Sequence, residues 1–318
     1  MVEEKYTCPK CGSQDSIWRG YRYNESGKKR LRKCKSCGAK FTIDDGFLRR
    51  RFQKEHIVEA VSLYQSGLSL SKVKDHMWQH HGVKVSRWMI LLWCRDYSKK
   101  IDKFTQTLQP EIKGNVHADE VIVKTKGKKN WYWGAKDRKT KFKIAGKLTK
   151  RRTLSGAKHV FDRIRNGCKG LPPKIITDKL GHYRRAYNIF FYRLRGKCKL
   201  VHGVPIACKK YGLEHNNNCA ERDNERIKQR YKITRGFKNS ESAEDFLRLL
   251  DNCYNFVNPH MSLGGKTPAE EAGINLDLER NKLMSLIKLF HYSLYGEFFS
   301  ENFERINCID GRGAFKSL

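Results

Sequence analysis

The sequence contains no long apolar run. No stretch of its 318 residues approaches the roughly 20 consecutive apolar residues that span a bilayer, which excludes a membrane-spanning helix. The polar opening, Met1 to Lys5, also lacks the apolar core of a secretory signal peptide. We therefore expect a cytoplasmic protein, long enough for one sizeable core and smaller modules.

Acidic residues are scarce relative to basic ones. Asp and Glu total 33 against 66 for Lys and Arg, which gives a formal net charge of +33. A chain this basic attracts a polyanion and releases the counterions bound to it, so we expect nucleic acid as the partner. Basic ribosomal and chromatin proteins are the alternative. They rarely combine such charge with 39% hydrophobic residues and a long alternation of strand-like and helix-like segments.

Most of the cysteines are scattered, which argues against a disulfide framework. Four of them form two C-x-x-C-G pairs with 22 residues between the pairs: Cys8, Cys11, Cys34 and Cys37. Each pair can turn through its glycine so that both thiolates face one tetrahedral Zn²⁺. The spacing predicts one structural zinc ion in a zinc ribbon over residues 1–46, with short strands near residues 16–23, 29–35 and 41–43.

Basic side chains follow the strands of this expected ribbon. They are Arg19, Arg22, Lys28, Lys29, Arg30, Arg32 and Lys33. Such a row favours contact with DNA phosphates. The alternative is a ribbon that only folds and docks, because runs of charge are often solvated faces.

Residues 47–104 have helical periodicity and predict three helices. A basic run of Arg49, Arg50 and Arg51 leads into them. Ser69 and Ser86 are the expected caps of the second and third helices, and Arg87 is the first residue of the third. Short turns and a polar start to the third helix are typical of a helix-turn-helix, with Arg87 available to a major groove.

A small helical bundle that only links two domains is the alternative for this region. The apolar run over residues 89–93 supports it, since those side chains must be buried against something. We expect Trp88 and Trp93 in the core rather than stacked on bases.

Strand periodicity begins near residue 115. Three expected strands, over residues 116–123, 130–136 and 141–148, form an antiparallel meander. A helix (154–164), a strand (174–177), a helix (182–193), a strand (199–202) and a helix that carries Glu221 follow. This β-β-β-α-β-α-β-α order predicts an α/β ribonuclease H-like fold over residues 112–274, in which a mixed sheet is flanked by helices.

Two carboxylates fall on neighbouring strands of that fold. Asp119 lies within the first strand and Asp178 follows the fourth, so adjacent strands would place them side by side. Glu120 would point to the opposite face, because strand side chains alternate. Grouped carboxylates bind Mg²⁺ or Mn²⁺, and a pair of such ions can activate a water or a 3'-hydroxyl for attack on a phosphodiester.

The spacing leaves the third ligand open between two glutamates. Glu221 and Glu225 are one helical turn apart and share a face, whereas Asp223 is turned roughly 200° away from Glu221. Either glutamate could close the site. The basic residues around them can hold phosphates, or simply keep the helix soluble: Arg222, Arg226, Lys228 and Arg230.

At these motifs the chain resembles the DDE transposases of prokaryotic insertion sequences, within the retroviral-integrase-like superfamily. The matching segments are His117-Ala-Asp119-Glu120, Thr177-Asp178-Lys179 and Asn217-Asn218-x-x-Glu221-x-Asp223. The resemblance implies a catalytic triad of Asp119, Asp178 and Glu221 with two Mg²⁺ (or Mn²⁺), and so selects Glu221 over Glu225. It also implies DNA as the partner, both the element ends and the target, and a homo-oligomer assembled on that DNA.

The chain departs from the family pattern at two positions and in one interval. Family members often have His where Asn224 stands and Arg where Asn258 stands. The 42 residues between Asp178 and Glu221 exceed the compact form of the family, and we expect the extra length within residues 195–211. The cysteines and histidine of that segment offer either buried core residues or an irregularly spaced second metal site: Cys198, His202 and Cys208.

The leading hypothesis is a transposase that binds the terminal repeats of its element, nicks them and joins the freed 3' ends to a target. One alternative is a DNA-binding regulator without catalytic function, against which the presence of all three acids argues. Another is a ribonuclease H-like nuclease, which would not need two DNA-reading modules. Residues 275–318 form a C-terminal tail of unknown role. A helix expected there over residues 276–294 suits a dimer contact or packing on the protein's own core.

Overall fold

The computed structural model describes residues 6–24, 27–42, 44–203, 217–234 and 236–293. The chain divides into two compact units. The first comprises residues 1–62, 76–85 and 275–318, and the second comprises residues 63–75 and 86–274. None of the helices within the described ranges has the length and apolar character needed to cross a membrane.

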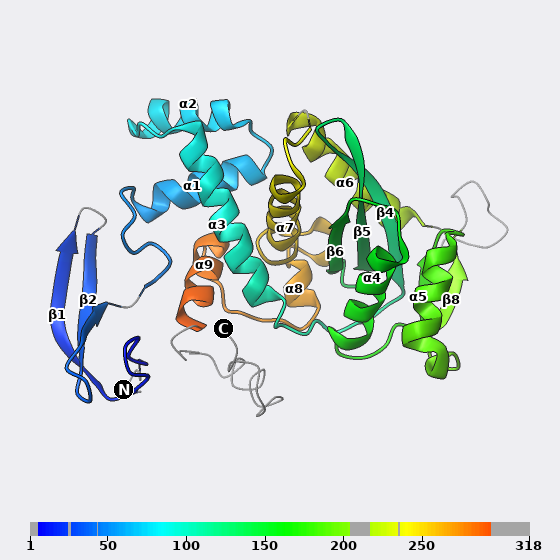
Figure 1. Ribbon diagram of the computed structural model, residues 1–318, viewed down its shortest axis with the longest axis horizontal. Helices are drawn as coiled ribbons and strands as arrows, with labels where there is room; N and C mark the ends of the chain where they lie inside the picture. Colours follow the sequence, from blue (N-terminus) through cyan, green and yellow to red (C-terminus); the bar gives the residue numbers. More distant parts are fainter. Residues whose placement is uncertain (1–5, 25–26, 43, 204–216, 235, 294–318) are drawn as a thin grey trace. The chain divides into compact units, whose positions relative to one another are not determined.

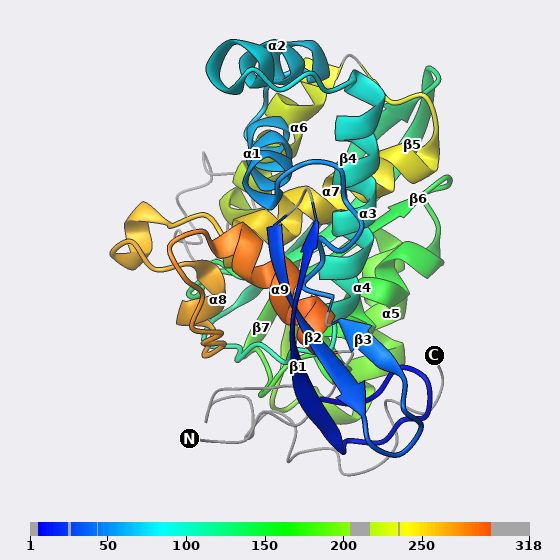
Figure 2. The same ribbon diagram turned by 90° about the vertical axis from the view of Figure 1, so that its left-hand side faces the viewer.

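The N-terminal part of the first unit is a three-stranded antiparallel sheet. It consists of β1 Ser16–Asn24, β2 Gly27–Cys34 and β3 Lys40–Thr42, in that order. Figure 2 shows the long β1–β2 hairpin with the short β3 beside β2. The sheet has a small core in which Tyr6 and Phe41 surround Cys8 and Cys34. So little apolar surface supplies little folding free energy, which makes a bound metal the natural source of the remainder.

Three helices follow the sheet: α1 Lys54–Gln65, α2 Leu70–His81 and α3 Arg87–Thr105. Both predicted serine caps are present. The Ser69 hydroxyl accepts a hydrogen bond from the backbone N–H of Lys72 (3.3 Å), and the Ser86 hydroxyl accepts one from Met89 (3.1 Å). Each cap satisfies a backbone donor that has no partner within its own helix.

The predicted C-terminal helix begins six residues later than its apolar pattern indicates. α9 spans Lys282–Ser293, so the prediction of a helix from residue 276 is wrong at its start. Asp277 has a φ of 46°, which a right-handed helix does not allow. The side chain of Asn281 accepts a hydrogen bond from the backbone N–H of Met284 (3.1 Å) and so marks the start of the helix.

The apolar face of α9 is buried in the first unit. Its buried residues include Leu283, Leu286, Ile287 and Phe290. Ile287 approaches Gly46 so closely that a Cβ at that glycine would lie 2.7 Å from the Ile287 methyl group. His291 lies 3.5 Å from the carboxylate of Asp44 in the same region. Of the two alternatives for this helix, the structure favours packing on the protein's own core.

The second unit is built on a five-stranded mixed sheet in the order β6-β5-β4-β7-β8. β4 Val116–Thr125, β5 Lys128–Asp137 and β6 Lys143–Thr149 form an antiparallel meander, and β7 Lys174–Thr177 and β8 Lys199–His202 continue it in parallel with β4. The β4–β5 turn consists of Lys126 and Gly127, both with positive φ (47° and 75°). This is the two-residue turn whose twist matches that of paired strands.

Helices cover both faces of this sheet (Figure 1). α6 Asn218–Thr234 and α7 Ser240–Phe256 pack on the face that carries Val121 and Tyr132. α4 Leu154–Asn166 and α5 Gly181–Phe191 cover the other face, where the rings of Trp133 and Tyr183 lie 5.7 Å apart. Neighbouring strand residues point to opposite faces, so Tyr132 and Trp133 each contribute to a different core layer.

Short elements complete the second unit: η1 Tyr192–Leu194, η4 Met261–Leu263 and α8 Pro268–Glu271. The order and pairing of the strands, with helices on both faces, confirm the predicted ribonuclease H-like fold class. The short length of β7 determines which residues meet at its end. β7 ends opposite the middle of β4, so the residue after β7 lies beside the centre of the longer strand.

Candidate active site

The structure brings Asp119 and Asp178 together. In the parallel pair β4 and β7, His117 lies opposite Ile176, and Asp119 and Asp178 come two residues further along their chains. The carboxylates of Asp119, Glu120 and Asp178 each have an oxygen within 4.8 Å of the others. Asp178 also accepts a hydrogen bond from the backbone N–H of Leu180 (3.0 Å), which fixes the turn that leaves β7.

Glu120 reaches this group from the other face of the sheet, where alternation along the strand predicts its side chain. Its carboxylate accepts hydrogen bonds from the hydroxyl of Tyr183 in α5 (2.6 Å) and from Nε of Arg152 (2.7 Å). The guanidinium of Arg152 also lies 3.6 Å from Asp178. Arg152 therefore offsets part of the negative charge and lies where a phosphate oxygen could bind it.

The surroundings of Asp119 disfavour its charged form. Its pKa is raised to about 7, chiefly by burial and next by the negative charges of Glu120 and Asp178. A divalent cation among these carboxylates would remove the repulsion. The donors are all carboxylate oxygens, the ligand type that Mg²⁺ and Mn²⁺ prefer, so the residues present fit such an ion.

Helix α6 approaches the same place from the Asp119 face of the sheet. Asn224 donates a hydrogen bond from Nδ2 to Oδ2 of Asp119 (2.8 Å). Glu221 lies three residues earlier, in the first turn of α6, and is exposed. Its carboxylate is not part of the group within 4.8 Å. Around the helix, Glu221 is turned about 60° from Asn224 and Glu225 about 100°, so Glu221 lies nearer the direction of Asp119.

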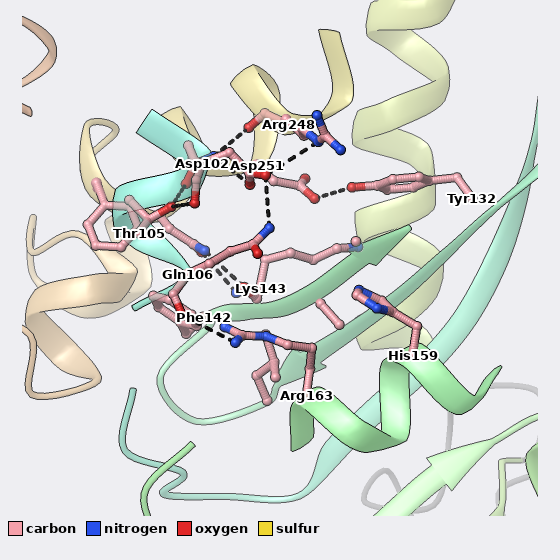
Figure 3. Close-up of a pocket in the computed structure, with 16 residues that line it drawn as sticks. Asp102, Thr105, Gln106, Tyr132, Phe142, Lys143, His159, Arg163, Arg248 and Asp251 are labelled. Carbon is pink, nitrogen blue, oxygen red and sulfur yellow. Dashed lines mark hydrogen bonds and ion pairs between the residues drawn. The ribbon is translucent and has the colours of Figure 1, made fainter. Parts of the chain in front are cut away.

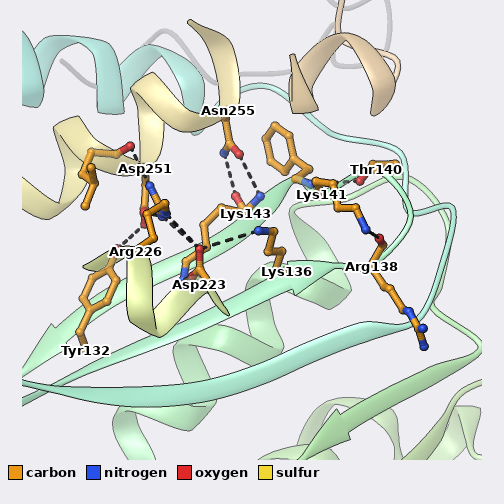
Figure 4. Close-up of polar contacts among 12 residues, drawn as sticks. Tyr132, Lys136, Arg138, Thr140, Lys141, Lys143, Asp223, Arg226, Asp251 and Asn255 are labelled. Atoms are coloured by element: carbon orange, nitrogen blue, oxygen red, sulfur yellow. Dashed lines mark hydrogen bonds and ion pairs between the residues drawn. The ribbon is translucent and has the colours of Figure 1, made fainter. Parts of the chain in front are cut away.

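Asp223 fixes how α6 is rotated on the sheet. It is buried and forms ion pairs with Lys143 of β6 and, at 3.1 Å, with Arg226 of its own helix (Figure 4). Lys136 of β5 lies 4.0 Å from the same carboxylate. Burial opposes the charged form of Asp223, but Lys143, Arg226 and Lys136 outweigh burial and lower its pKa. Because Asp223 points into the sheet, Glu221 and Asn224 lie on other sides of the helix.

The same network extends to α7. Arg226 pairs with Asp251 (2.7 Å), and Asp251 accepts a hydrogen bond from the Tyr132 hydroxyl. Asn255 exchanges two hydrogen bonds of 2.9 Å with the backbone of Lys143. Figure 3 shows a polar pocket beside these groups, lined also by Asp102, which pairs with Arg248 at 3.3 Å. None of the carboxylates around Asp119 lines this pocket, so we assign it to helix packing.

The four predicted zinc ligands lie together in the first unit. All four Sγ atoms lie within 4.8 Å of one another: those of Cys8, Cys11, Cys34 and Cys37. The Cys8–Cys37 and Cys11–Cys34 sulfur pairs are 3.7 and 3.5 Å apart. Four thiolates at 2.3 Å around a tetrahedral zinc ion would be separated by about 3.8 Å, so the cluster fits Zn²⁺.

The glycines after both cysteine pairs have the backbone angle that the predicted knuckles require. Gly12 has a φ of 73° and Gly38 a φ of 68°. A second metal site formed by Cys198, His202 and Cys208 gains no support from the described residues. Cys198 is buried, and Cys208 lies outside the described residues.

The predicted DNA-binding residues of α6 differ in their surroundings. Lys228 is exposed, whereas Arg230 is half-buried and donates a hydrogen bond to the backbone carbonyl of Ser66. Arg226 is engaged with Asp223 and Asp251, as described above. Lys228 is therefore directed to solvent, as is Arg222, whereas Arg226 and Arg230 are engaged within the protein.

In the helical region, Arg49, Arg51 and Arg87 are exposed, Arg50 is half-buried, and the Arg87 guanidinium lies 3.5 Å from the Ser71 hydroxyl. Trp93 is 2% exposed, as expected for a core residue, but Trp88 is 58% exposed, and the prediction that it is buried is wrong. Five residues place Trp88 about 140° around α3 from Trp93, so both cannot face one core.

Part of this chain is similar to known proteins. Residues 113–257 match a family model described as a DDE domain. The catalytic core domain of HTLV-2 integrase, in complex with magnesium in its trimeric form, is 18% identical over 52% of this chain and 98% of that one, with a TM-score of 0.34. The simian T-cell lymphotropic virus intasome, in complex with PP2A regulatory subunit B56 gamma, is 15% identical over 67% and 72%, with a TM-score of 0.37. No curated protein matches.

Residues 113–257 are therefore similar to a DDE domain, which agrees with the resemblance to DDE transposases that the sequence motifs indicate. This similarity supports a transposase-type function that uses a divalent metal ion.

Proposed function

We propose that the protein is a DNA transposase that binds the ends of its insertion sequence, cleaves them and joins the freed 3' ends to target DNA. One observation carries this proposal: the carboxylates of Asp119 and Asp178 lie together at the junction of β4 and β7, beside the helix that carries Glu221. When bound there, two Mg²⁺ ions would activate the attacking oxygen and stabilise the leaving one. Asp119, Asp178 and Glu221 would hold them.

Glu221 is the third ligand in this proposal. The hydrogen bond between Asn224 and Asp119 sets the side of α6 that faces the carboxylates. Glu221 is nearer that side than Glu225, and a side-chain rotation of an exposed glutamate can bring its carboxylate inward when a cation is bound. Arg152, between Glu120 and Asp178, is suited to orient a phosphate of the DNA strand.

The proposed partners are the element ends, the target DNA and further copies of this chain assembled on DNA. The net charge of +33 supports DNA, since it favours a polyanion. The ribbon over residues 1–46 and the helix-turn-helix over residues 47–104 would read the ends. The catalytic domain over residues 112–274 would act on them.

The experiment that tests this function uses the DNA that flanks the gene. Short inverted repeats there provide the substrate, and the purified chain with Mg²⁺ should nick them and transfer the 3' ends to a plasmid. Binding without cleavage under these conditions would favour the alternative function of a DNA-binding regulator without catalytic activity. Cleavage of DNA that lacks the repeats, at equal rate and without joining, would favour the ribonuclease H-like nuclease.

We predict that Arg87→Ala weakens binding to the element ends by about 1 to 3 kcal/mol and relaxes discrimination at one base position. The reason is that Arg87 is exposed at the start of α3, where a recognition helix contacts base edges. Binding titrations on specific and random DNA, at several salt concentrations, measure the effect. Equal losses on both DNAs would contradict the base-reading role.

The matched control is the basic run before α1. Replacing Arg49, Arg50 and Arg51 by Ala should weaken binding to all sequences alike and reduce its dependence on salt, because phosphate contacts carry no sequence information. A change in sequence preference caused by this triple variant, without a change in salt dependence, would reverse the two assignments.

We predict that one thiolate-bound Zn²⁺ copurifies with each chain and that Cys34→Ser releases it. The ribbon should then unfold while the catalytic domain keeps its own thermal transition, since the small core of Tyr6 and Phe41 cannot order the sheet alone. Zinc released by a thiol-specific reagent, together with calorimetry, measures both effects. Protein that is free of zinc when freshly purified, with all four cysteines intact, would contradict this prediction.

A further inference from the structure

Four histidines and a glutamate gather on α1 and α2 within the first unit. They are His56, Glu59, His76, His80 and His81. The Glu59 carboxylate lies 2.9 Å from Nε2 of His76 and 2.9 Å from Nε2 of His81. The other two imidazoles flank this trio, with ring centroids 5.0 Å apart for His56 and His81 and 4.3 Å apart for His76 and His80.

Helical spacing brings these residues to one place. His56 and Glu59 are three residues apart on α1, and His76 and His80 are four apart on α2, so each pair shares a helix face. α2 ends at His81, and Gly82 follows it with a φ of 63°. No cysteine takes part, so this cluster is chemically different from the zinc ribbon.

The trio has the donor atoms and the access that a metal ion needs. Nε2 of His76, Nε2 of His81 and an oxygen of Glu59 all lie within 4.8 Å of one another. Ligands at 2.0 to 2.1 Å around a tetrahedral zinc ion are separated by about 3.4 Å, so the two distances of 2.9 Å between Glu59 and the imidazoles would lengthen by about half an ångström to seat the ion. The three side chains are 29%, 31% and 33% exposed, which leaves a path from solvent.

The donor atoms of the trio decide which ion it suits. An anionic carboxylate beside two imidazoles suits Zn²⁺ rather than Mg²⁺, which prefers an all-oxygen set.

We propose that His76, His81 and Glu59 bind a Zn²⁺ ion that clamps α1 to α2, with a flanking imidazole or a water as the fourth ligand. This second zinc site lies in the predicted DNA-reading region and is independent of the transposase activity. Bound only by residues of two helices, the ion would restrain their packing against each other.

The test is a calorimetric titration of Zn²⁺ into the full chain that already holds its thiolate-bound zinc. The wild type should bind one further ion per chain. His76→Asn and His81→Asn should each weaken that binding at least about tenfold, and the double variant should abolish it. His260→Asn is the matched control, because it removes an imidazole that contacts Ser262 (3.0 Å) in the other unit.

A second measurement keeps the test decisive if a variant folds poorly. Co²⁺ added to the wild type should give visible bands of a nitrogen and oxygen site, without the thiolate charge-transfer band. Glu59→Gln, which preserves side-chain size, should remove those bands. The proposal is overturned if the wild type binds no ion beyond the thiolate-bound one, or if the double histidine variant binds it as tightly as the wild type.

Discussion

Asp119→Asn should abolish both DNA cleavage and strand transfer while leaving binding to the element ends nearly intact. The substitution preserves shape but removes the charge through which the half-buried Asp119 would hold a metal ion next to Asp178. Metal-ion stabilisation of the transition state contributes several kcal/mol, so the loss should be at least about a thousandfold in rate. Asp178→Asn should have the same effect, since both carboxylates would share the ions.

Two matched variants on α6 test which glutamate is the third metal ligand. Glu221→Gln should be as inactive as Asp119→Asn, whereas Glu225→Gln should retain activity. Both glutamates are exposed on α6 and the substitutions are chemically identical, so any difference in stability should be small. Single-turnover cleavage and joining assays with Mg²⁺, beside a binding assay, measure the outcome.

Wild-type cleavage by any one of these variants would remove that residue from the site. The opposite pattern at the third position, an inactive Glu225→Gln beside an active Glu221→Gln, would mean that α6 turns on binding DNA or metal. Loss of DNA binding together with cleavage would instead show that the substitution has disturbed the fold.

The sequence predicted the fold of the second unit well because local signals agreed with each other. The alternation of β4, the two-residue turn at Lys126 and Gly127, and the serine caps of α2 and α3 all depend on nearby residues. The pairing of β4 with β7 followed from the order of elements. α9 was less predictable, because its apolar pattern extends beyond the point where Asp277 breaks the helix.

The candidate site was predictable where strand geometry determines it and not where long-range packing does. The closeness of Asp119 and Asp178 follows from their places on adjacent strands. Arg152 comes from the segment before α4, and no local spacing signals that it reaches Glu120 and Asp178. Asn224 was visible only as the residue one helical turn after Glu221 that departs from the family pattern. Trp88 was misjudged, because its position around α3 had to be compared with that of Trp93.

Asp223 shows how a residue turned away from the site can control it. Its position, roughly 200° from Glu221, excluded it as a metal ligand. In the structure that same direction points it at Lys143 and Lys136 on the sheet. The ion pairs fix the rotation of α6, and therefore the side of the helix that Glu221 and Asn224 present to Asp119.

We predict that Asp223→Asn destabilises the protein by about 3 to 5 kcal/mol, because it leaves the charge of buried Lys143 without its partner. The double variant Asp223→Asn, Lys143→Met should recover much of that loss, since it removes the unpaired charge. Glu225→Gln, on the exposed side of the same helix, should stay within about 0.5 kcal/mol of the wild type. Urea unfolding of all four proteins measures these differences.

The double variant also separates stability from positioning. If the ion pair orients α6, the double variant should be stable yet cleave DNA more slowly than the wild type, because apolar packing does not fix the rotation of the helix as a directed ion pair does. Full activity in the stable double variant would assign Asp223 to stability alone. An unchanged unfolding midpoint in Asp223→Asn would contradict the buried ion pair itself.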